Sequence, residues 1–126
     1  MIKTERQYKN LLKQVKEMES SLENLRHQYR AEGHSDEDID ILLQATQTWI
    51  DKHKYDIDYY ERIKKGDFDE ITNFDNLGRL FIALRCAKDL SQRKFAEMLD
   101  VDESVVSRDE QSEYYGLTLS RAKKIL

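Results

Sequence analysis

Apolar residues near the start of the chain recur in alternating steps of four and three. The repeat runs for nearly four heptads, and the positions between are mostly Lys, Glu, Gln, Arg and Asn. This spacing is typical of a coiled-coil helix, and Gly33 follows as a helix end. We therefore expect a helix from about Thr4 to Glu32, with its apolar positions at Thr4, Tyr8, Leu11, Val15, Met18, Leu22, Leu25 and Tyr29.

A second helical pattern begins after Ser35. Ser35 is a suitable N-cap, and residues 36–38 make the first turn acidic. Gly66 suits the end of this helix, and a break in the pattern at 54–56 indicates a kink. The apolar stripe comprises Ile39, Leu42, Leu43, Thr46, Trp49, Ile50, His53, Ile57, Tyr60 and Ile63.

Only about three residues join these two helices, so residues 1–66 are predicted to form a long, coiled-coil-like αα-hairpin. Two arrangements remain open. In one, the hairpin is a dimerisation module, because its apolar face is wider than one partner helix covers, and two hairpins form a four-helix bundle. In the other, the hairpin is intramolecular only. The first arrangement predicts contacts between copies from Tyr8, Leu11, Val15, Met18, Leu22, Leu25 and Trp49.

Shorter helices are predicted from residue 75 onward. Residues 67–74 form a connector whose apolar positions are Phe68, Ile71 and Phe74. The first short helix holds Leu77, Leu80, Phe81 and Leu84, with Asn73 or Asp75 as its cap. Three more helices follow, and their predicted caps are Ser91, Asp102 and Thr118.

The order of residues between the second and third short helices indicates a helix-turn-helix. This motif needs a small residue where the helices cross, a turn residue that accepts left-handed geometry, and an apolar residue at the corner. Ala96, Asp100 and Val101 stand at these places, and Val106 is expected to face the core. Asp tolerates the left-handed region, although less well than Gly.

Residues 90–110, LSQRKFAEMLDVDESVVSRDE, resemble the helix-turn-helix of the Xre/Cro-like repressor family. The family resemblance extends over roughly Leu77–Leu126, about 40% of the chain, and implies a compact lambda-repressor-like domain over residues 75–126. Three residues depart from the family: Asp100 replaces a turn Gly, Asp109 an apolar residue, and Ser112 a Gly that ends the third helix. The opening IKTERQY and the long helices resemble a small bacterial subfamily, some of whose members are antitoxins of the HigA kind.

The resemblance implies that the third helix enters the major groove of DNA. Arg108 is then the candidate for a bidentate contact to guanine, Val105 for a thymine methyl, and Gln92 for a phosphate or an adjacent base. Arg108 could instead pair with a neighbouring acid, and Gln92 could be an ordinary exposed residue. Arg93, Lys94 and Arg121 are candidate phosphate contacts. The predicted DNA-binding residues are Gln92, Arg93, Glu103, Ser104, Val105, Ser107 and Arg108.

Composition supports an all-α fold but only weakly supports nucleic-acid binding. The 126 residues include no proline and four glycines, so few turns are available. Nine basic and nine acidic residues make residues 75–126 neutral, and the whole net charge of −4 falls on residues 1–74. A neutral domain can bind DNA only if its bases share one face.

Other functional classes find little support in the sequence. The lone Cys86 cannot form an internal disulfide, which suits a reducing cytoplasm, and we expect it to be a buried apolar residue. No apolar run approaches the ~20 residues of a membrane span. The three histidines are dispersed and no Gly-rich phosphate loop is present, so we expect no enzyme, metal or cofactor.

The sequence therefore predicts a cytoplasmic, sequence-specific transcription repressor that binds an inverted-repeat operator as a dimer. An antitoxin that binds a toxin protein and represses its own operon is the alternative. A structural adaptor that has lost DNA contact is a third possibility, because the third short helix is rich in acids.

Overall fold

A computed structural model describes residues 1–70 and 74–126 of the chain. These residues form α-helices and one 3₁₀ turn, with no strand among them, which confirms the predicted all-α class. The chain divides into two compact units, Met1–Tyr59 and Tyr60–Leu126. Across the described ranges, none of the helices combines the length and the apolar character needed to cross a membrane.

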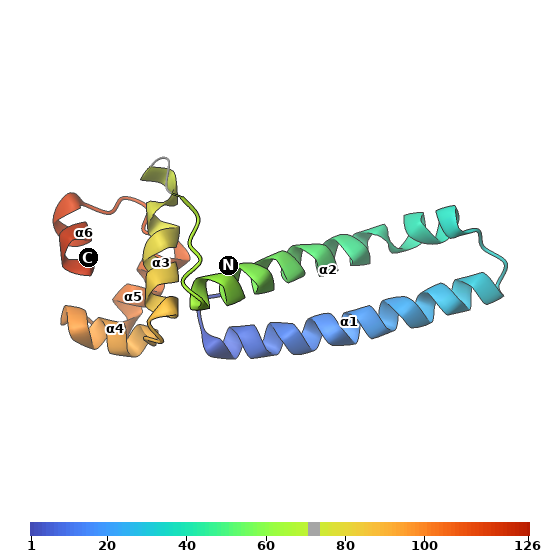
Figure 1. Ribbon diagram of the computed structural model, residues 1–126, viewed down its shortest axis with the longest axis horizontal. Helices are drawn as coiled ribbons and strands as arrows, with labels where there is room; N and C mark the ends of the chain where they lie inside the picture. The colour runs from blue at the N-terminus through green and yellow to red at the C-terminus, as the bar shows by residue number, and fades with distance from the viewer. Residues whose placement is uncertain (71–73) are drawn as a thin grey trace. The chain divides into compact units, whose positions relative to one another are not determined.

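The first unit holds two long helices that lie side by side and run in opposite directions (Figure 1). They are α1 (Glu5–Ala31) and α2 (Asp36–Lys64), whose last turn belongs to the second unit. The side chain of Thr4 accepts a hydrogen bond from the backbone N–H of Gln7, and Ser35 accepts one from Asp38. The predicted Ser35 cap is thus confirmed. Helix α2 continues through residues 54–56, so the break in the apolar pattern there does not interrupt the helix.

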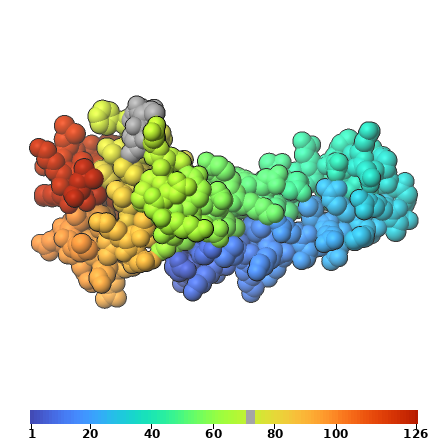
Figure 2. Space-filling model, in the orientation of Figure 1, coloured from blue at the N-terminus to red at the C-terminus, as the bar shows by residue number. Residues whose placement is uncertain are grey.

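One narrow apolar stripe closes the space between α1 and α2. The buried residues of α1 are Val15 and Leu22, which are seven residues apart and so lie on one side of the helix. Helix α2 contributes Ile39, Leu43, Ile50 and Ile57. The space-filling view shows the two helices in contact along much of their length (Figure 2). Two further predicted seam residues, Leu11 and Leu25, are only half-buried.

The second unit consists of η1 (Phe74–Asn76), α3 (Leu77–Ala87), α4 (Gln92–Leu99), α5 (Glu103–Gln111) and α6 (Leu119–Ile125). The predicted caps of the last three helices are confirmed: Ser91, Asp102 and Thr118 each accept a hydrogen bond from a backbone N–H of the first turn. The predicted Asp75 cap of α3 is wrong, because Asp75 lies in η1 and Asn76 precedes the helix. The alternative cap Asn73 and the connector residue Ile71 lie outside the described residues.

The last turn of α2 is tied to the end of α3. Lys64 Nζ donates to the Cys86 carbonyl oxygen at 3.1 Å and also pairs with the Asp89 carboxylate. These bonds explain why the second unit begins inside α2, before the boundary expected at Gly66. Cys86 is buried, as predicted, and its burial raises the pKa of the thiol.

A glycine allows the start of α3 to touch the turn after α5. A Cβ atom on Gly78 would lie 1.8 Å from the Glu113 carbonyl oxygen. Glu113 and Tyr114 both adopt positive φ angles, 51° and 59°, so this turn is already constrained. The contact positions the segment that follows α5 and therefore helps to set the position of α5 itself.

Candidate nucleic-acid interface

A tight turn joins α4 to α5. Asp100 adopts left-handed geometry, with φ 57° and ψ 47°, as the sequence predicted. The N–H of Val101 donates to the Ala96 carbonyl oxygen at 3.0 Å, which completes the end of α4. Val101 was expected to fill the corner, but its side chain is 41% exposed. Asp102 then begins α5, and the backbone N–H of Ser104 lowers the pKa of its carboxyl group.

Helices α4 and α5 cross at a small residue. Ala96 is 2% exposed and packs with Phe95 and Val106 in one buried cluster. A methyl side chain in this buried cluster allows two helix backbones to approach closely. The expectation that Val106 faces the core is confirmed. The packing of α5 against both α4 and α3 holds it in one orientation.

The opposite side of α5 is exposed. Ser104, Ser107 and Arg108 lie on this side, and Glu103 is exposed at the first turn. Gln111 follows Ser104 by seven residues and shares the exposed side, although it was not among the predicted residues. Its spacing was a signal that could have identified it, since positions i, i+4 and i+7 lie on one helix face. We define the outer row of α5 as Ser104, Ser107, Arg108 and Gln111.

Val105 does not lie fully on that row. Its side chain is half-buried and lines a hollow together with Leu99, Val101 and Ile125. Only part of the side chain is therefore available for the thymine contact that the resemblance implied.

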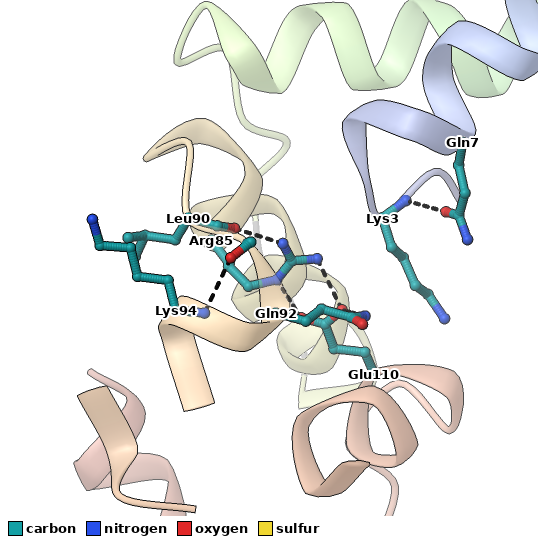
Figure 3. A network of polar contacts seen from close by, with 8 residues as sticks. Lys3, Gln7, Arg85, Leu90, Gln92, Lys94 and Glu110 are labelled. Carbon is teal, nitrogen blue, oxygen red and sulfur yellow. Dashed lines mark hydrogen bonds and ion pairs between the residues drawn. The ribbon is translucent and has the colours of Figure 1, made fainter. Parts of the chain in front are cut away.

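A buried ion pair connects α3 to α5. Arg85 Nε donates to Glu110 Oε1 at 2.5 Å, and Nη2 donates to Oε2 at 2.9 Å (Figure 3). Arg85 Nη1 also donates to the Leu90 carbonyl oxygen at 2.7 Å. Burial alone would lower the pKa of Arg85, but the hydrogen bonds and charge of Glu110 outweigh it and leave that pKa raised. The pair was not predicted, because its partners lie 25 residues apart in the chain.

Gln92 joins the same network from α4. Its Nε2 donates to Glu110 Oε2 at 2.7 Å (Figure 3). The alternative in which Gln92 is an ordinary exposed residue therefore does not hold. A primary amide carries two hydrogens, and one nitrogen can donate to Glu110 and to a further acceptor. Gln92 therefore helps to orient α5 through its hydrogen bond to Glu110. The predicted contact of Gln92 with a DNA phosphate stays a prediction.

Arg108 differs from Arg93 and Arg121 in its ion pairing: each of those two lies beside an acid of the second unit. Glu110 pairs with Arg85, and Asp109 pairs with Arg121. Arg93 Nε lies 3.7 Å from Glu97 Oε1 on the surface of α4. Within residues 1–70 and 74–126, no acid forms an ion pair with Arg108. The alternative in which Arg108 pairs with Asp109, Glu110 or Glu113 is not observed.

The residues that depart from the repressor pattern make local contacts. Asp109 is half-buried, and its carboxylate pairs with Arg121 of α6. Ser112 ends α5, and Glu113 and Tyr114 take the left-handed geometry after it. Tyr114 is buried edge-on against Phe81, with ring centroids 5.5 Å apart, whereas Tyr115 is exposed.

The residues predicted to join two copies fall into two groups. Val15 and Leu22 are already buried in the single chain, along the stripe between α1 and α2. Met18 is exposed, and the other four are half-buried: Tyr8, Leu11, Leu25 and Trp49.

Comparisons with protein-family models, with curated proteins and with solved structures found no match to this chain.

Proposed function

We propose that the chain is a sequence-specific DNA-binding transcription repressor, in which α4 and α5 form a helix-turn-helix and α5 enters the major groove. The observation that carries this proposal is the outer row of α5, which is exposed on a helix whose inner side is held by Val106 and Glu110. An α-helix fits the major groove, and specificity requires exposed polar side chains at base edges.

Arg108 is the principal base contact in this proposal. Its guanidinium can form two parallel hydrogen bonds with guanine, and its charge is not committed to an acid in the described part of the chain. Ser104 and Ser107 are short donors beside it. Arg93 and Lys94, near the start of α4, contact phosphates and add affinity without sequence information.

The chain acts as a dimer on an inverted repeat, because two copies related by a two-fold axis match two half-sites about one helical turn apart. Since residues 75–126 have no net charge, few phosphates are neutralised and the salt dependence is modest.

A gel-shift titration at increasing salt tests the proposal. Duplex DNA from the promoter of the gene itself should shift, and the affinity should fall linearly on a logarithmic salt scale. Failure to shift any promoter fragment at low salt, with the protein shown to be folded by circular dichroism, would refute DNA binding.

A further inference from the structure

The two sides of the α1–α2 hairpin differ in charge. On one side, ion pairs cross between the helices: Arg26 Nη1 lies 2.8 Å from Asp40 Oδ1, Arg30 Nε lies 3.2 Å from Asp36 Oδ1, and Glu19 pairs with Lys54. In α1, Glu19 and Arg26 follow the same heptad position, immediately beside the buried stripe.

The other side of the hairpin is lined mainly by uncharged side chains on α1. On α1, the residues on this flank are Leu11, Met18 and Leu25, spaced by seven, and the row outside them is uncharged throughout: Gln7, Gln14, Ser21 and Gln28. On α2, Leu42 and Trp49 occupy the corresponding flank, away from Asp40 and Lys54. A hollow whose lining includes Leu11, Gln14, His53 and Asp56 shows that these flanks of α1 and α2 face the same side, with Asp56 at its edge. We define the neutral face as Leu11, Met18, Leu25, Leu42 and Trp49.

Several side chains of the neutral face are accessible in the single chain. Leu42 is 53% exposed and Met18 is 37% exposed, and the rest are half-buried. The Trp49 ring stacks on His53 with centroids 4.1 Å apart, and His53 Nδ1 donates to the Trp49 carbonyl oxygen at 2.7 Å. The indole is therefore held in place before any partner arrives, which lowers the entropic cost of binding.

We propose that the neutral face binds the same face of a second copy, with α1 of each chain against α2 of the other, so that two hairpins form a four-helix bundle. This inference rests on the proposed function, because it assigns the interface of the proposed dimer. The two-fold axis runs parallel to the helices.

Charge selects a second copy as the occupant. In a two-fold interface the same patch meets itself, so a charged patch places like charges opposite one another. The five side chains of the neutral face carry no charge, so a second copy places no like charges opposite one another. A basic or acidic protein finds no complementary charge among these five residues.

The area of the face suits a reversible dimer. The strip that includes the flanking row from Gln7 to Gln28 is about 30 Å long, and with a width of about 20 Å for two helices it buries about 1,200 Å² in total, at the lower limit of specific interfaces. Dissociation is therefore expected at accessible concentrations, and the dimer is measurable as an equilibrium.

The direction of the axis follows from the length of the hairpin. Helix α1 has 27 residues, or about 40 Å at the usual rise. A two-fold axis perpendicular to the helices would place the C-terminal ends of the two α2 helices at opposite ends of the bundle. The second unit begins in the last turns of α2, so its two copies would then be far apart. A two-fold axis parallel to the helices keeps the two α2 ends at the same end of the bundle, as half-sites about 34 Å apart require. The antiparallel register then sets Leu25 opposite the partner's Leu42 and Met18 opposite the partner's Trp49.

Sedimentation equilibrium of the full chain without DNA tests the interface. Leu42 and Ile41 are neighbours in α2 and both are exposed, but only Leu42 lies on the neutral face, so Leu42→Glu and Ile41→Glu form a matched pair. The wild type and Ile41→Glu should show a concentration-dependent dimer, and Leu42→Glu should remain monomeric with unchanged helix content. Met18→Lys should repeat this result if Leu42→Glu fails to fold. A monomeric wild type at micromolar concentrations, or equal effects of the matched pair, would overturn the proposal.

Single-cysteine variants in a Cys86→Ser background test the pairing of helices. A mixture of Leu25→Cys and Leu42→Cys chains should form disulfide-linked dimers faster than either variant alone. Faster cross-linking of Leu25→Cys with itself would show α1 against α1 and overturn the axis. Because neither measurement contains DNA, a dimer that binds no DNA would refute the proposed function and leave this interface standing. A DNA-binding monomer would refute this interface and the dimer, and would leave DNA binding through α5 standing.

Discussion

Arg85 and Glu110 form a bidentate ion pair inside the second unit, and both side chains are almost completely inaccessible, at 3% and 0% exposed. The pair joins α3 to the helix whose outer row we assign to DNA. Breaking such a pair leaves one buried charge without its partner, which costs far more than the loss of a surface ion pair. The orientation of α5 therefore depends on this contact as well as on apolar packing.

Glu110→Gln should lower the free energy of unfolding by about 3–5 kcal/mol, because the Arg85 charge remains buried without a carboxylate. Urea denaturation of the full chain measures this effect. The control is Glu113→Gln, three residues further along and exposed, which should change stability by less than about 0.5 kcal/mol. Equal losses for the two variants would contradict the role assigned to the ion pair.

Gly78→Ala should destabilise the second unit by about 3 kcal/mol, because the new methyl group meets backbone that cannot rotate away. Thermal unfolding followed by circular dichroism gives the measurement. Asn76→Ala, just before α3 and without a side-chain cap bond, serves as the control and should have little effect. An unchanged unfolding temperature for Gly78→Ala would show that α3 does not approach the turn at Glu113.

Tyr114 should make the protein less stable at alkaline pH. Burial, followed by the charges of Glu110 and Asp109, raises the pKa of its phenol above the ordinary value of 10.0. The fold favours the neutral phenol, so this contribution is fully present below about pH 10 and is lost as the pH rises and the unfolded state ionises. Stability measured from pH 8 to pH 11 should fall less steeply for Tyr114→Phe than for the wild type. Identical slopes would mean that Tyr114 does not contribute.

Asp100→Gly should stabilise the protein by about 1 kcal/mol, because glycine adopts the left-handed geometry without the cost borne by other residues. Asp102→Ala, two residues later, should have the opposite effect and lose about 1 kcal/mol with the N-cap bond to Ser104. Chemical denaturation of both variants distinguishes the two roles. If Asp100→Gly were as destabilising as Asp102→Ala, Asp100 would be contributing more than its backbone conformation.

Local chemistry made much of this fold predictable from the sequence. Caps such as Ser91 and Asp102 act on backbone groups within three residues, and the left-handed preference of Asp100 is a property of one residue. Heptad spacing likewise identified Val15 and Leu22 as buried, because both lie on one helix face.

Long-range pairing was not predictable in the same way. Nothing in the local sequence around Glu110 distinguishes an exposed acid on a helix from one that meets Arg85 in the core. The same holds for Asp109, whose partner Arg121 lies 12 residues away across a turn. Heptad spacing also could not separate residues buried within one hairpin from those that stay exposed on it, since Val15 and Met18 follow the same repeat.

Selection of bound sites from random duplex DNA tests the central claim most directly, with the wild type and Arg108→Ala compared in parallel. The wild type should enrich an inverted repeat whose half-sites contain a guanine. Arg108→Ala should lose about 1–3 kcal/mol of affinity and relax the preference at that one position in each half-site. Enrichment of the same sequence by both proteins, or of no sequence by the wild type, would contradict the assignment of α5 to the major groove.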